Sequence, residues 1–332
     1  MATLSRDHKI FVAGHRGLIG SALVRNLKDC GYTNVITRGR EELDLLDSNA
    51  VYQFLESNKP DAIILSAAMV GGIYANNTYR SEFIFNNLQI QNNVIWNAHK
   101  LDIDRLIFLG SSCIYPRNAP QPMPEEALLT GMLEFTNRPY ALAKISGLEL
   151  TNSIRLQYGR NYFSVMPTNL YGPGDNFHKK NSHVLPALIR RFIEAREQKS
   201  PEVVVWGSGT PKREFMYVDD CANAIIFLME NFSEEKIKGT AIEKYGWSHV
   251  NLGSGDEVTI LELANIIAES VGYEGRIVFD SSKPDGPPRK LVDITVLKNI
   301  GWKPKIHLRE GVERTVSWFM EKQKDDPSSL RL

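Results

Sequence analysis

A glycine-rich loop near the start of the chain constrains the fold more than any other feature of the sequence. Gly14, Gly17 and Gly20 follow a short apolar run at Lys9–Ala13 and precede an amphipathic segment at Leu18–Asp29. Glycine permits positive φ angles and leaves no Cβ between the backbone and a bound pyrophosphate. A tight turn without a ligand, which is the alternative, needs fewer glycines. The loop therefore predicts a dinucleotide site made of Gly14, His15, Arg16, Gly17, Leu18, Ile19 and Gly20.

The first half of the sequence alternates between strand and helix patterns. Short apolar runs indicate buried parallel strands, and the amphipathic stretches between them indicate helices. This alternation predicts an α/β fold with a doubly wound parallel sheet, in which ligands lie at the carboxyl ends of the strands. The expected strands are Lys9–Ala13, Asn34–Thr37, Asp61–Leu65, Arg105–Leu109 and Tyr162–Met166; the expected helices are Leu18–Asp29, one capped by Ser48 and ending near Ser57, Ser81–Leu101 and Arg138–Tyr158.

The pattern becomes more mixed after Pro167. We expect residues 1–170 to form the dinucleotide-binding domain and residues 171–332 mainly a smaller α/β substrate lobe, because 332 residues exceed what one core usually holds. One or two elements of the second half are expected to return and complete the sheet. The elements expected there are helices near Val184–Glu197, Asp219–Glu230 and Thr259–Val271, strands near Val203–Trp206, Phe215–Val218 and Val250–Leu252, and a last helix at the end.

The composition argues against several other classes of protein. Lysine plus arginine equals aspartate plus glutamate at 39 each, so there is no overall basic charge with which to bind nucleic acid. Three scattered cysteines, Cys30, Cys113 and Cys221, favour neither a disulfide framework nor a zinc site, and no metal is expected. The polar N-terminus without a signal pattern, and the lack of a long apolar run, favour a cytoplasmic protein outside the membrane.

The residues after the second expected strand bear on which dinucleotide binds. NAD enzymes usually carry Asp or Glu here to accept the ribose hydroxyls. This chain has Arg38-Gly39-Arg40 instead, and a guanidinium matches a 2′-phosphate in charge and geometry. The alternative is two solvated arginines on a surface loop. We predict NADPH/NADP rather than NADH, with Arg38 and Arg40 at the 2′-phosphate.

Three further residues form a pattern suited to hydride transfer. Ser111 follows the fourth expected strand, and Tyr140 and Lys144 lie four apart on one face of the next long helix. Lys144 can lower the pKa of the Tyr140 phenol, which then gives a proton to an alkoxide as hydride arrives. Ser111 can hold the carbonyl oxygen. Tyr-x-x-x-Lys alone also occurs in ordinary amphipathic helices, but the glycine loop and the serine-rich strand end make chance a poor explanation.

Cys113 and a histidine point to acid–base chemistry beside this triad. Cys113 comes two residues after Ser111, and a thiol can act as an acid or base at carbon because its reference pKa is close to neutral. The alternative is a small buried cysteine without chemistry. The segment from Met166 to His183 leaves the fifth strand towards the cofactor, so its histidine could be the second acid or base. With seven histidines in the chain, a lone one on a surface loop would carry little weight.

Together these motifs resemble the extended short-chain dehydrogenases/reductases that act on sugar nucleotides, over nearly the whole chain. The resemblance implies a Rossmann-type NAD(P) domain, a C-terminal nucleotide-sugar lobe and usually a homodimer built on a helix bundle. Longer matches narrow it to the GDP-L-fucose synthases, which epimerise C3 and C5 and reduce C4 of GDP-4-keto-6-deoxy-D-mannose. The matching stretches are Val12–Gly17, Val70–Thr78, Gly110–Pro116, Pro139–Lys144, Met166–His183 and Lys283–Lys290.

The resemblance implies a role for each matching position. Cys113 and His183 would exchange protons at C3 and C5, in either order of acid and base, and Ser111, Tyr140 and Lys144 would then reduce C4. Trp206 follows an apolar strand and could instead belong to the core. The implied cofactor contacts are Leu109, Gly110, Ser111, Ser112, Tyr140, Lys144, Pro167, Thr168, Asn169, Leu170 and His183, and the implied GDP-sugar contacts are Arg191, Trp206, Arg213 and Asp285.

Two other functions remain open at this point. A sugar-nucleotide 4-epimerase on the same scaffold would keep NAD bound and regenerate it. A non-catalytic NADP-sensing protein of this fold would bind the cofactor without chemistry, and such proteins can lose the tyrosine and lysine pair. Net consumption of NADPH separates the first alternative from a reductase, and retention of Ser111, Cys113, Tyr140 and Lys144 argues against the second.

Overall fold

A six-stranded parallel sheet forms the centre of the molecule. The computed structural model describes residues 4–179, 181–232, 241–283 and 285–332. Within them the sheet runs in the order β2-β1-β3-β4-β5-β9, and the five neighbouring pairs are all parallel. The predicted parallel α/β fold is confirmed. The strands are β1 (Ile10–Ala13), β2 (Val35–Ile36), β3 (Ala62–Leu65), β4 (Arg105–Leu109), β5 (Asn161–Pro167) and β9 (His249–Leu252).

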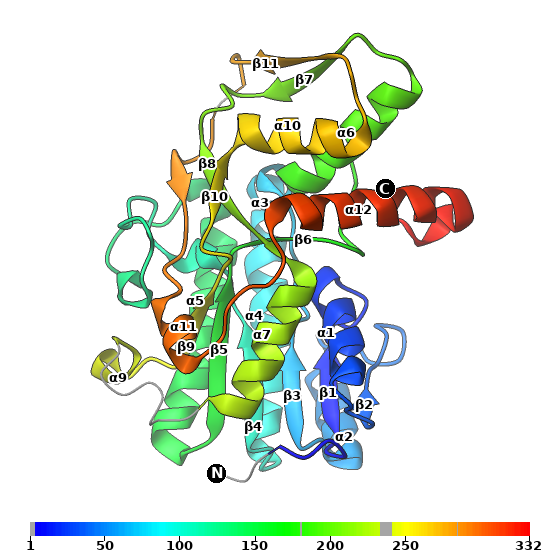
Figure 1. The fold of residues 1–332 in the computed structure, drawn as a ribbon. Coiled ribbons are helices and arrows are strands. Elements are labelled where there is room, and N and C mark those ends of the chain that lie inside the picture. The colour runs from blue at the N-terminus through cyan, green and yellow to red at the C-terminus, as the bar shows by residue number, and fades with distance from the viewer. Residues whose placement is uncertain (1–3, 180, 233–240, 284) are drawn as a thin grey trace.

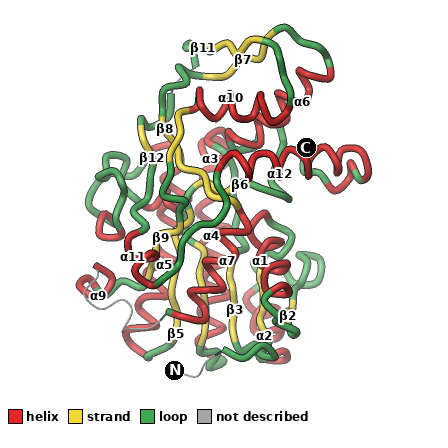
Figure 2. Tube along the Cα trace, viewed as in Figure 1, coloured by secondary structure: helices red, strands yellow, loops and turns green. Residues whose placement is uncertain are grey.

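Helices cover both faces of this sheet, which explains why its strands are apolar at consecutive positions (Figure 2). Ile10, Val12 and Ile64 pack on one side with helices α1 (Leu18–Asp29) and α7 (Val218–Asn231). Phe11 and Ile63 face the other side, with α2 (Ser48–Asn58), α4 (Arg80–Lys100) and α5 (Arg138–Tyr158). Strand β2 lies on one side of β1 and β3 lies on the other. The crevice in which doubly wound sheets bind ligands is therefore at the carboxyl end of β1.

A second group of elements stands beyond one end of the sheet, at the top of Figure 1, and has a hydrophobic core of its own. Strand β8 (Lys212–Tyr217) pairs with β6 (Asn169–Tyr171), β10 (Glu257–Thr259) and β12 (Arg289–Lys290), while β7 (Glu202–Trp206) pairs with β11 (Arg276–Asp280). Helices α6 (Val184–Glu197), α10 (Ile260–Val271) and α12 (Leu308–Asp325) pack with them. The remaining elements are α3 (Ile73–Thr78), α9 (Ala241–Tyr245), α11 (Thr295–Ile300), η1 (Ser112–Ile114), η2 (Glu125–Ala127), η3 (Phe135–Asn137) and η4 (Pro327–Ser329).

The structure corrects some local predictions. Asp47, not Ser48, caps α2, because its carboxylate accepts hydrogen bonds from the backbone N–H groups of Asn49 and Ala50. Strands β6, β10, β11 and β12 and helix α3 have no counterpart among the predicted elements. Several of them are only two or three residues long, which is too short for a recognisable period. The matching stretch Lys283–Lys290 includes Pro284, which lies outside the described residues, as do residues 1–3 of the N-terminus. None of the described helices is long and apolar enough to span a membrane.

Candidate active site

The glycine loop forms a tight crossing between β1, α1 and the end of β3. Gly14 has φ +89°, and a Cβ there would lie 2.6 Å from the backbone nitrogen of Ala67. A Cβ on Gly20 would collide with the carbonyl of Gly14, so the third glycine is what lets the helix lie against the strand end. Both positions therefore demand glycine for physical reasons.

The same loop presents the start of α1 as an anion site. Gly17 is the N-cap of this helix, and among the described residues no side chain caps it. The N–H groups of the first turn of a helix have no partner inside the helix, and the helix dipole adds positive potential there. A pyrophosphate fits this position in charge and in hydrogen bonding. His15, Leu18 and Ile19 lie on the same turn and are all half-buried.

Three arginines lie on the glycine loop or on the segment after β2. Arg38 and Arg40 are both exposed; Arg38 lies over the Phe54 ring, and Arg40 is 3.7 Å from Asp44. Arg16, on the glycine loop itself, makes two hydrogen bonds to the carboxylate of Glu41. No acidic residue occupies the usual ribose position, and the Glu41 carboxylate is turned towards Arg16 of the glycine loop. Arg16 thus belongs to the glycine loop itself, while Arg38 and Arg40 belong to the segment that follows β2.

The reducing triad assembles where β4 ends and α5 passes it. Lys144 is buried, with 3% of its surface exposed, and its ammonium donates to the carbonyl of Leu109 at 2.7 Å. Burial lowers the pKa of Lys144 to about 8. Burial raises the pKa of Tyr140 above its usual value, and a hydrogen bond from Ser111 opposes the rise. Lys144 lies 5.7 Å from the centre of the Tyr140 ring. The lowering of the phenol pKa by Lys144 stays a prediction.

Cys113 lies beside this triad, next to a lysine without a predicted role. Only 7% of Cys113 is exposed, and the Ser111 hydroxyl accepts a hydrogen bond from its backbone N–H at 3.3 Å. Burial raises the pKa of the Cys113 thiol, while the charge of Lys290, a hydrogen bond donated by the Ser111 hydroxyl and the charge of Lys144 lower it. Lys290 has the largest effect among these opposing groups. The thiol is buried, as expected for a cysteine without chemistry. Two ammonium groups, those of Lys290 and Lys144, nevertheless act on it.

His183 has a charge interaction with the same lysine. It is the N-cap of α6, and it stays open to solvent although protein surrounds its ring on the other sides. These surroundings, followed by the charge of Lys290, lower the pKa of His183. The loop before it is held by the Asn181 carbonyl, which accepts from the Gly72 N–H at 3.3 Å. Cys113 and His183, far apart in sequence, therefore share one charged neighbour.

The four residues implied to hold the sugar nucleotide lie in the second group of elements. Trp206 is 63% exposed at the end of β7, which rules out the core alternative. Its ring lies 5.9 Å from the Arg191 guanidinium and 5.8 Å from the Lys283 ammonium. Burial lowers the pKa of Arg213, whose guanidinium donates to the carbonyls of Lys212 and Pro287, both at 2.7 Å. Asp285 accepts from both the N–H and the hydroxyl of Ser208.

The remaining predicted contacts line the carboxyl ends of β4 and β5. Leu109 ends β4, and the buried Gly110 and Ser112 follow it. Pro167 ends β5, and the Thr168 N–H donates to the carbonyl of Leu252 in β9. The Asn169 amide donates to the Glu214 carbonyl, and Asn169 and Leu170 belong to β6. These predicted contacts thus meet at the carboxyl ends of β4 and β5, while Arg38 and Arg40 follow β2, the strand at the edge of the sheet.

Lys290 is the main residue of the site that sequence reasoning did not assign. It lies on β12 and has charge interactions with Cys113, Arg213 and Glu214. The sequence held one signal for it, since Arg289-Lys290 ends the last matching stretch, but no periodic pattern shows which of two adjacent cations faces the site.

Comparisons with known proteins agree with this geometry. The model of the NAD dependent epimerase/dehydratase family matches residues 10–243. A GDP-L-fucose synthase of Escherichia coli K12 is 55% identical over 315 residues, which are 95% of this chain and 97% of that protein. GDP-L-fucose synthase 1 of Arabidopsis thaliana is 54% identical over 95% of this chain and 94% of its own length. The solved structure of a GDP-L-fucose synthetase from Naegleria fowleri bound to NADP is similar with a TM-score of 0.87 and 28% identity, covering 100% of this chain and 98% of that one.

Proposed function

The chain belongs to the NAD dependent epimerase/dehydratase family, and we propose that it is an oxidoreductase that converts GDP-4-keto-6-deoxy-D-mannose to GDP-L-fucose with NADPH. One observation carries the proposal: the Cys113 thiol lies among the reducing residues Ser111, Tyr140 and Lys144, and shares Lys290 with His183. A single site thus holds groups for proton exchange at carbon and groups for reduction of a ketone.

The cofactor part of the proposal rests on how well the residues fit NADP. The glycine loop and the uncapped start of α1 would hold the pyrophosphate, and Arg16, Arg38 and Arg40 would surround a 2′-phosphate. When bound, NADPH supplies the hydride for C4. Lys144 would hold the nicotinamide ribose, and Leu109 to Ser112 with Pro167 to Leu170 would form the wall around the nicotinamide.

The epimerisation follows from the acidity that a 4-ketone gives to its neighbours. Removal of the proton from C3 or C5 leaves an enolate whose charge sits on the oxygen at C4, where Ser111 and Tyr140 donate hydrogen bonds. Cys113 and His183 take and return protons at the two carbons. One carbonyl serves both epimerisations, so the sugar nucleotide need not relocate far between them.

The reduction uses the same carbonyl. Because burial raises the pKa of Tyr140, its phenol stays protonated at neutral pH and is ready to protonate the alkoxide at C4. Arg213 and Arg191 suit the diphosphate, since guanidinium forks match phosphate oxygens. Trp206, exposed between Arg191 and Lys283, suits a stacked guanine, and Asp285 would complete the nucleotide contacts.

The arginines predict a measurable cofactor preference. We expect Arg40→Ala to weaken NADPH binding about tenfold or more and to leave NADH binding unchanged, because only NADPH carries the phosphate that a charged hydrogen bond would hold. The ion pair between Arg40 and Asp44 is exposed, so its loss should cost little stability. Fluorescence titration with both cofactors measures the effect. Equal losses for the two cofactors, or none for NADPH, would remove Arg40 from the phosphate site.

NADPH oxidation tests the function itself against its two rivals. A reductase consumes one NADPH for each 4-keto sugar nucleotide, whereas a 4-epimerase regenerates its cofactor. A cofactor-sensing protein would bind NADPH and oxidise none with any 4-keto sugar nucleotide. Net oxidation with GDP-4-keto-6-deoxy-D-mannose therefore supports the proposal, and its absence would favour one of the rivals.

The domain division and the location are parts of the same proposal. We place the boundary at residue 170, since β1 to β5 with their helices pack on the sheet while α6, α10 and α12 share another core. Two elements of the second half of the chain also belong to the first domain: β9 joins the sheet, and α7 packs against it. A cytoplasmic location would keep the Cys113 thiol reduced, and recovery of the protein from another compartment in cell fractionation would contradict it.

A homodimer is supported by the outer face of α4 and α5. These helices lie against each other, and five large apolar side chains on them are exposed: Phe85, Trp96, Leu142, Leu156 and Tyr158. Large apolar side chains exposed on two adjacent helices favour a contact with another chain. We expect the protein to be dimeric in light scattering and the Phe85→Glu, Leu142→Glu double variant to be monomeric. A monomeric wild-type protein, or a double variant that stays dimeric, would contradict this face.

A further inference from the structure

Strand β12 presents one cation to the active site and another away from it. It pairs with β8 so that Lys290 stands opposite Arg213 and Arg289 stands opposite Lys212. Neighbouring residues of a strand point to opposite faces, and partners on paired strands share a face. Lys290 and Arg213 therefore lie on one face of the sheet, and Lys290 interacts there with the charge of Cys113. Arg289 and Lys212 lie on the opposite face. The strand has two residues, so its own ladder fixes it weakly.

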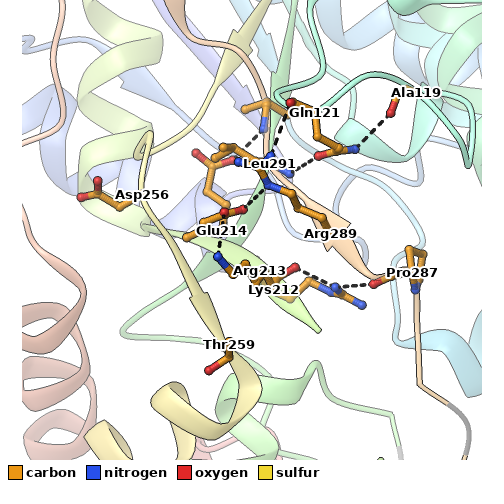
Figure 3. A network of polar contacts seen from close by, with 12 residues as sticks. Ala119, Gln121, Lys212, Arg213, Glu214, Asp256, Thr259, Pro287, Arg289 and Leu291 are labelled. Carbon is orange, nitrogen blue, oxygen red and sulfur yellow. Dashed lines mark hydrogen bonds and ion pairs between the residues drawn. The ribbon is translucent and has the colours of Figure 1, made fainter. Parts of the chain in front are cut away.

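Arg289 anchors the strand on the side away from Cys113. Its guanidinium donates to the Glu257 carboxylate at 2.7 Å and to the backbone carbonyl of Gln121 at 3.4 Å. Lys212 adds a second cation to Glu257 at 3.5 Å. Figure 3 shows Arg289 leaving the strand on the side of Gln121. The residue before Lys290 is thus held by a side chain of β10 and by a backbone group of the loop that follows η1.

Gln121 holds the residue after Lys290. Its side-chain oxygen accepts from the Leu291 N–H at 2.9 Å, and its amide donates to the Ala119 carbonyl at 3.5 Å (Figure 3). The Leu291 carbonyl in turn accepts from the Met123 N–H at 2.8 Å. Gln121 and Met123 lie on the loop that leaves η1, the turn that carries Cys113. One loop therefore connects the turn that carries the thiol with the strand that carries the lysine.

The effect of a lysine on a neighbouring charge depends on how firmly its backbone is held. Its ammonium sits on a flexible four-carbon stem, so its mean position depends on how well the backbone beneath it is fixed. The energy between two charges falls in inverse proportion to their separation, so doubling the distance from Lys290 to the thiolate halves its influence. Ser111 and Lys144 also act on this thiol, Arg213 and Glu214 have charge interactions with the ammonium, and the charge of Lys290 acts on His183 at the start of α6.

We propose that Gln121 and Arg289 are positioning residues, which clamp the two ends of β12 so that the Lys290 ammonium stays beside the Cys113 thiol. Neither side chain is among the groups that act on Cys113 or His183, so both act through the lysine. The value of this clamp to catalysis rests on the proposed function, in which Cys113 exchanges protons as a thiolate. The clamp itself is a property of the protein alone and is testable without substrate.

The test follows the reactivity of one thiol in the ligand-free protein. Cys113 is alkylated with iodoacetamide over a range of pH, and mass spectrometry of the peptides separates it from Cys30 and Cys221. We expect the pH profile of Cys113 to move upward in Gln121→Ala and in Arg289→Met, because the thiolate loses part of its counter-charge. A rise of half a pKa unit lowers the thiolate fraction at pH 7 about threefold, and the alkylation rate with it.

Two further variants separate positioning from general loosening. Arg289→Lys keeps a cation for Glu257 and should recover most of the wild-type profile. Arg276→Met removes a guanidinium 3.3 Å from Glu202 between two other strands of the same lobe, and its profile should match the wild type. Thermal unfolding is measured on all four. A lower melting temperature with an unchanged thiol profile in Gln121→Ala and Arg289→Met would overturn the proposal, because the clamp would then be structural only.

The outcome also separates this inference from the proposed function. Where either variant unfolds, Glu257→Gln tests the same clamp, since it removes the charge under Arg289 and keeps a hydrogen-bond acceptor. A shifted thiol profile in a protein that oxidises no NADPH would keep the clamp and reject the enzyme. Normal turnover of GDP-4-keto-6-deoxy-D-mannose with an unshifted thiol profile would keep the proposed function and reject the clamp.

Discussion

Cys113→Ser stops solvent deuterium from entering C3 and C5 of the sugar, while NADPH binding persists. A serine hydroxyl is far less acidic than a thiol, so it provides no useful base at neutral pH even beside Lys290 and Lys144. Loss of a positioned acid or base typically lowers the rate about 10²- to 10⁴-fold. The measurement is NMR of GDP-4-keto-6-deoxy-D-mannose incubated with the variant in D₂O.

Cys30→Ser is the matched control for this experiment. Cys30 is a half-buried free cysteine at the end of α1, and the charged groups with the largest effect on its pKa, Glu230 and Arg6, lie outside the candidate site. We expect its exchange rates to equal those of the wild type. Unchanged exchange in Cys113→Ser would remove this thiol from the mechanism, and with it the role assigned to Lys290. Loss of exchange in both variants would point to a general effect of removing cysteines.

Tyr140→Phe separates the two halves of the reaction. The phenol is the only proton donor assigned to the C4 oxygen during reduction, so we expect NADPH oxidation to fall about 10²- to 10⁴-fold. Exchange at C3 and C5 should fall much less, because the Ser111 hydroxyl still binds the enolate oxygen. The edge contact between the rings of Phe83 and Tyr140 survives the change, so the helix should keep its packing. Stopped-flow absorbance follows the cofactor, and NMR in D₂O follows the exchange.

Tyr158→Phe provides the control on the same helix. Tyr158 is exposed at the last position of α5, away from β4, and loss of its hydroxyl should leave both rates unchanged. If Tyr140→Phe stops exchange as completely as reduction, the phenol serves both steps and the division of labour between Tyr140 and Cys113 fails. If it slows neither, another group protonates C4.

The parts of the fold with strong local signals were predictable from the sequence. Helix α5 spans Arg138–Tyr158 as predicted, because a proline stands in its first turn and Gly159 ends it in the left-handed conformation. Helices α1 and α6 and strand β4 also have their predicted bounds. The glycine loop was predictable as well, since a Cβ at Gly14 or Gly20 would collide with backbone that the fold brings there.

The rest depends on contacts between distant segments. Strand β12 exists because Arg289 and Lys290 pair with residues of β8 that lie 77 positions earlier, and no local pattern encodes that partner. Lys290 could therefore be seen as basic but not as a neighbour of Cys113. The exposure of Trp206 had the same origin: β7 alternates between buried and exposed residues, and only the tertiary structure shows which face is covered. Helix capping at Asp47 rather than Ser48 was a choice between adjacent residues of similar chemistry.

The most direct test of the central claim is the full reaction carried out in D₂O. GDP-4-keto-6-deoxy-D-mannose and NADPH are incubated with the protein, cofactor oxidation is followed by absorbance, and the product is examined by NMR. One site that epimerises twice and then reduces should consume one NADPH for each sugar and yield GDP-L-fucose with deuterium at both C3 and C5. A reduced product with unchanged configuration and no deuterium at these carbons would contradict the account, because the site would then be a simple reductase.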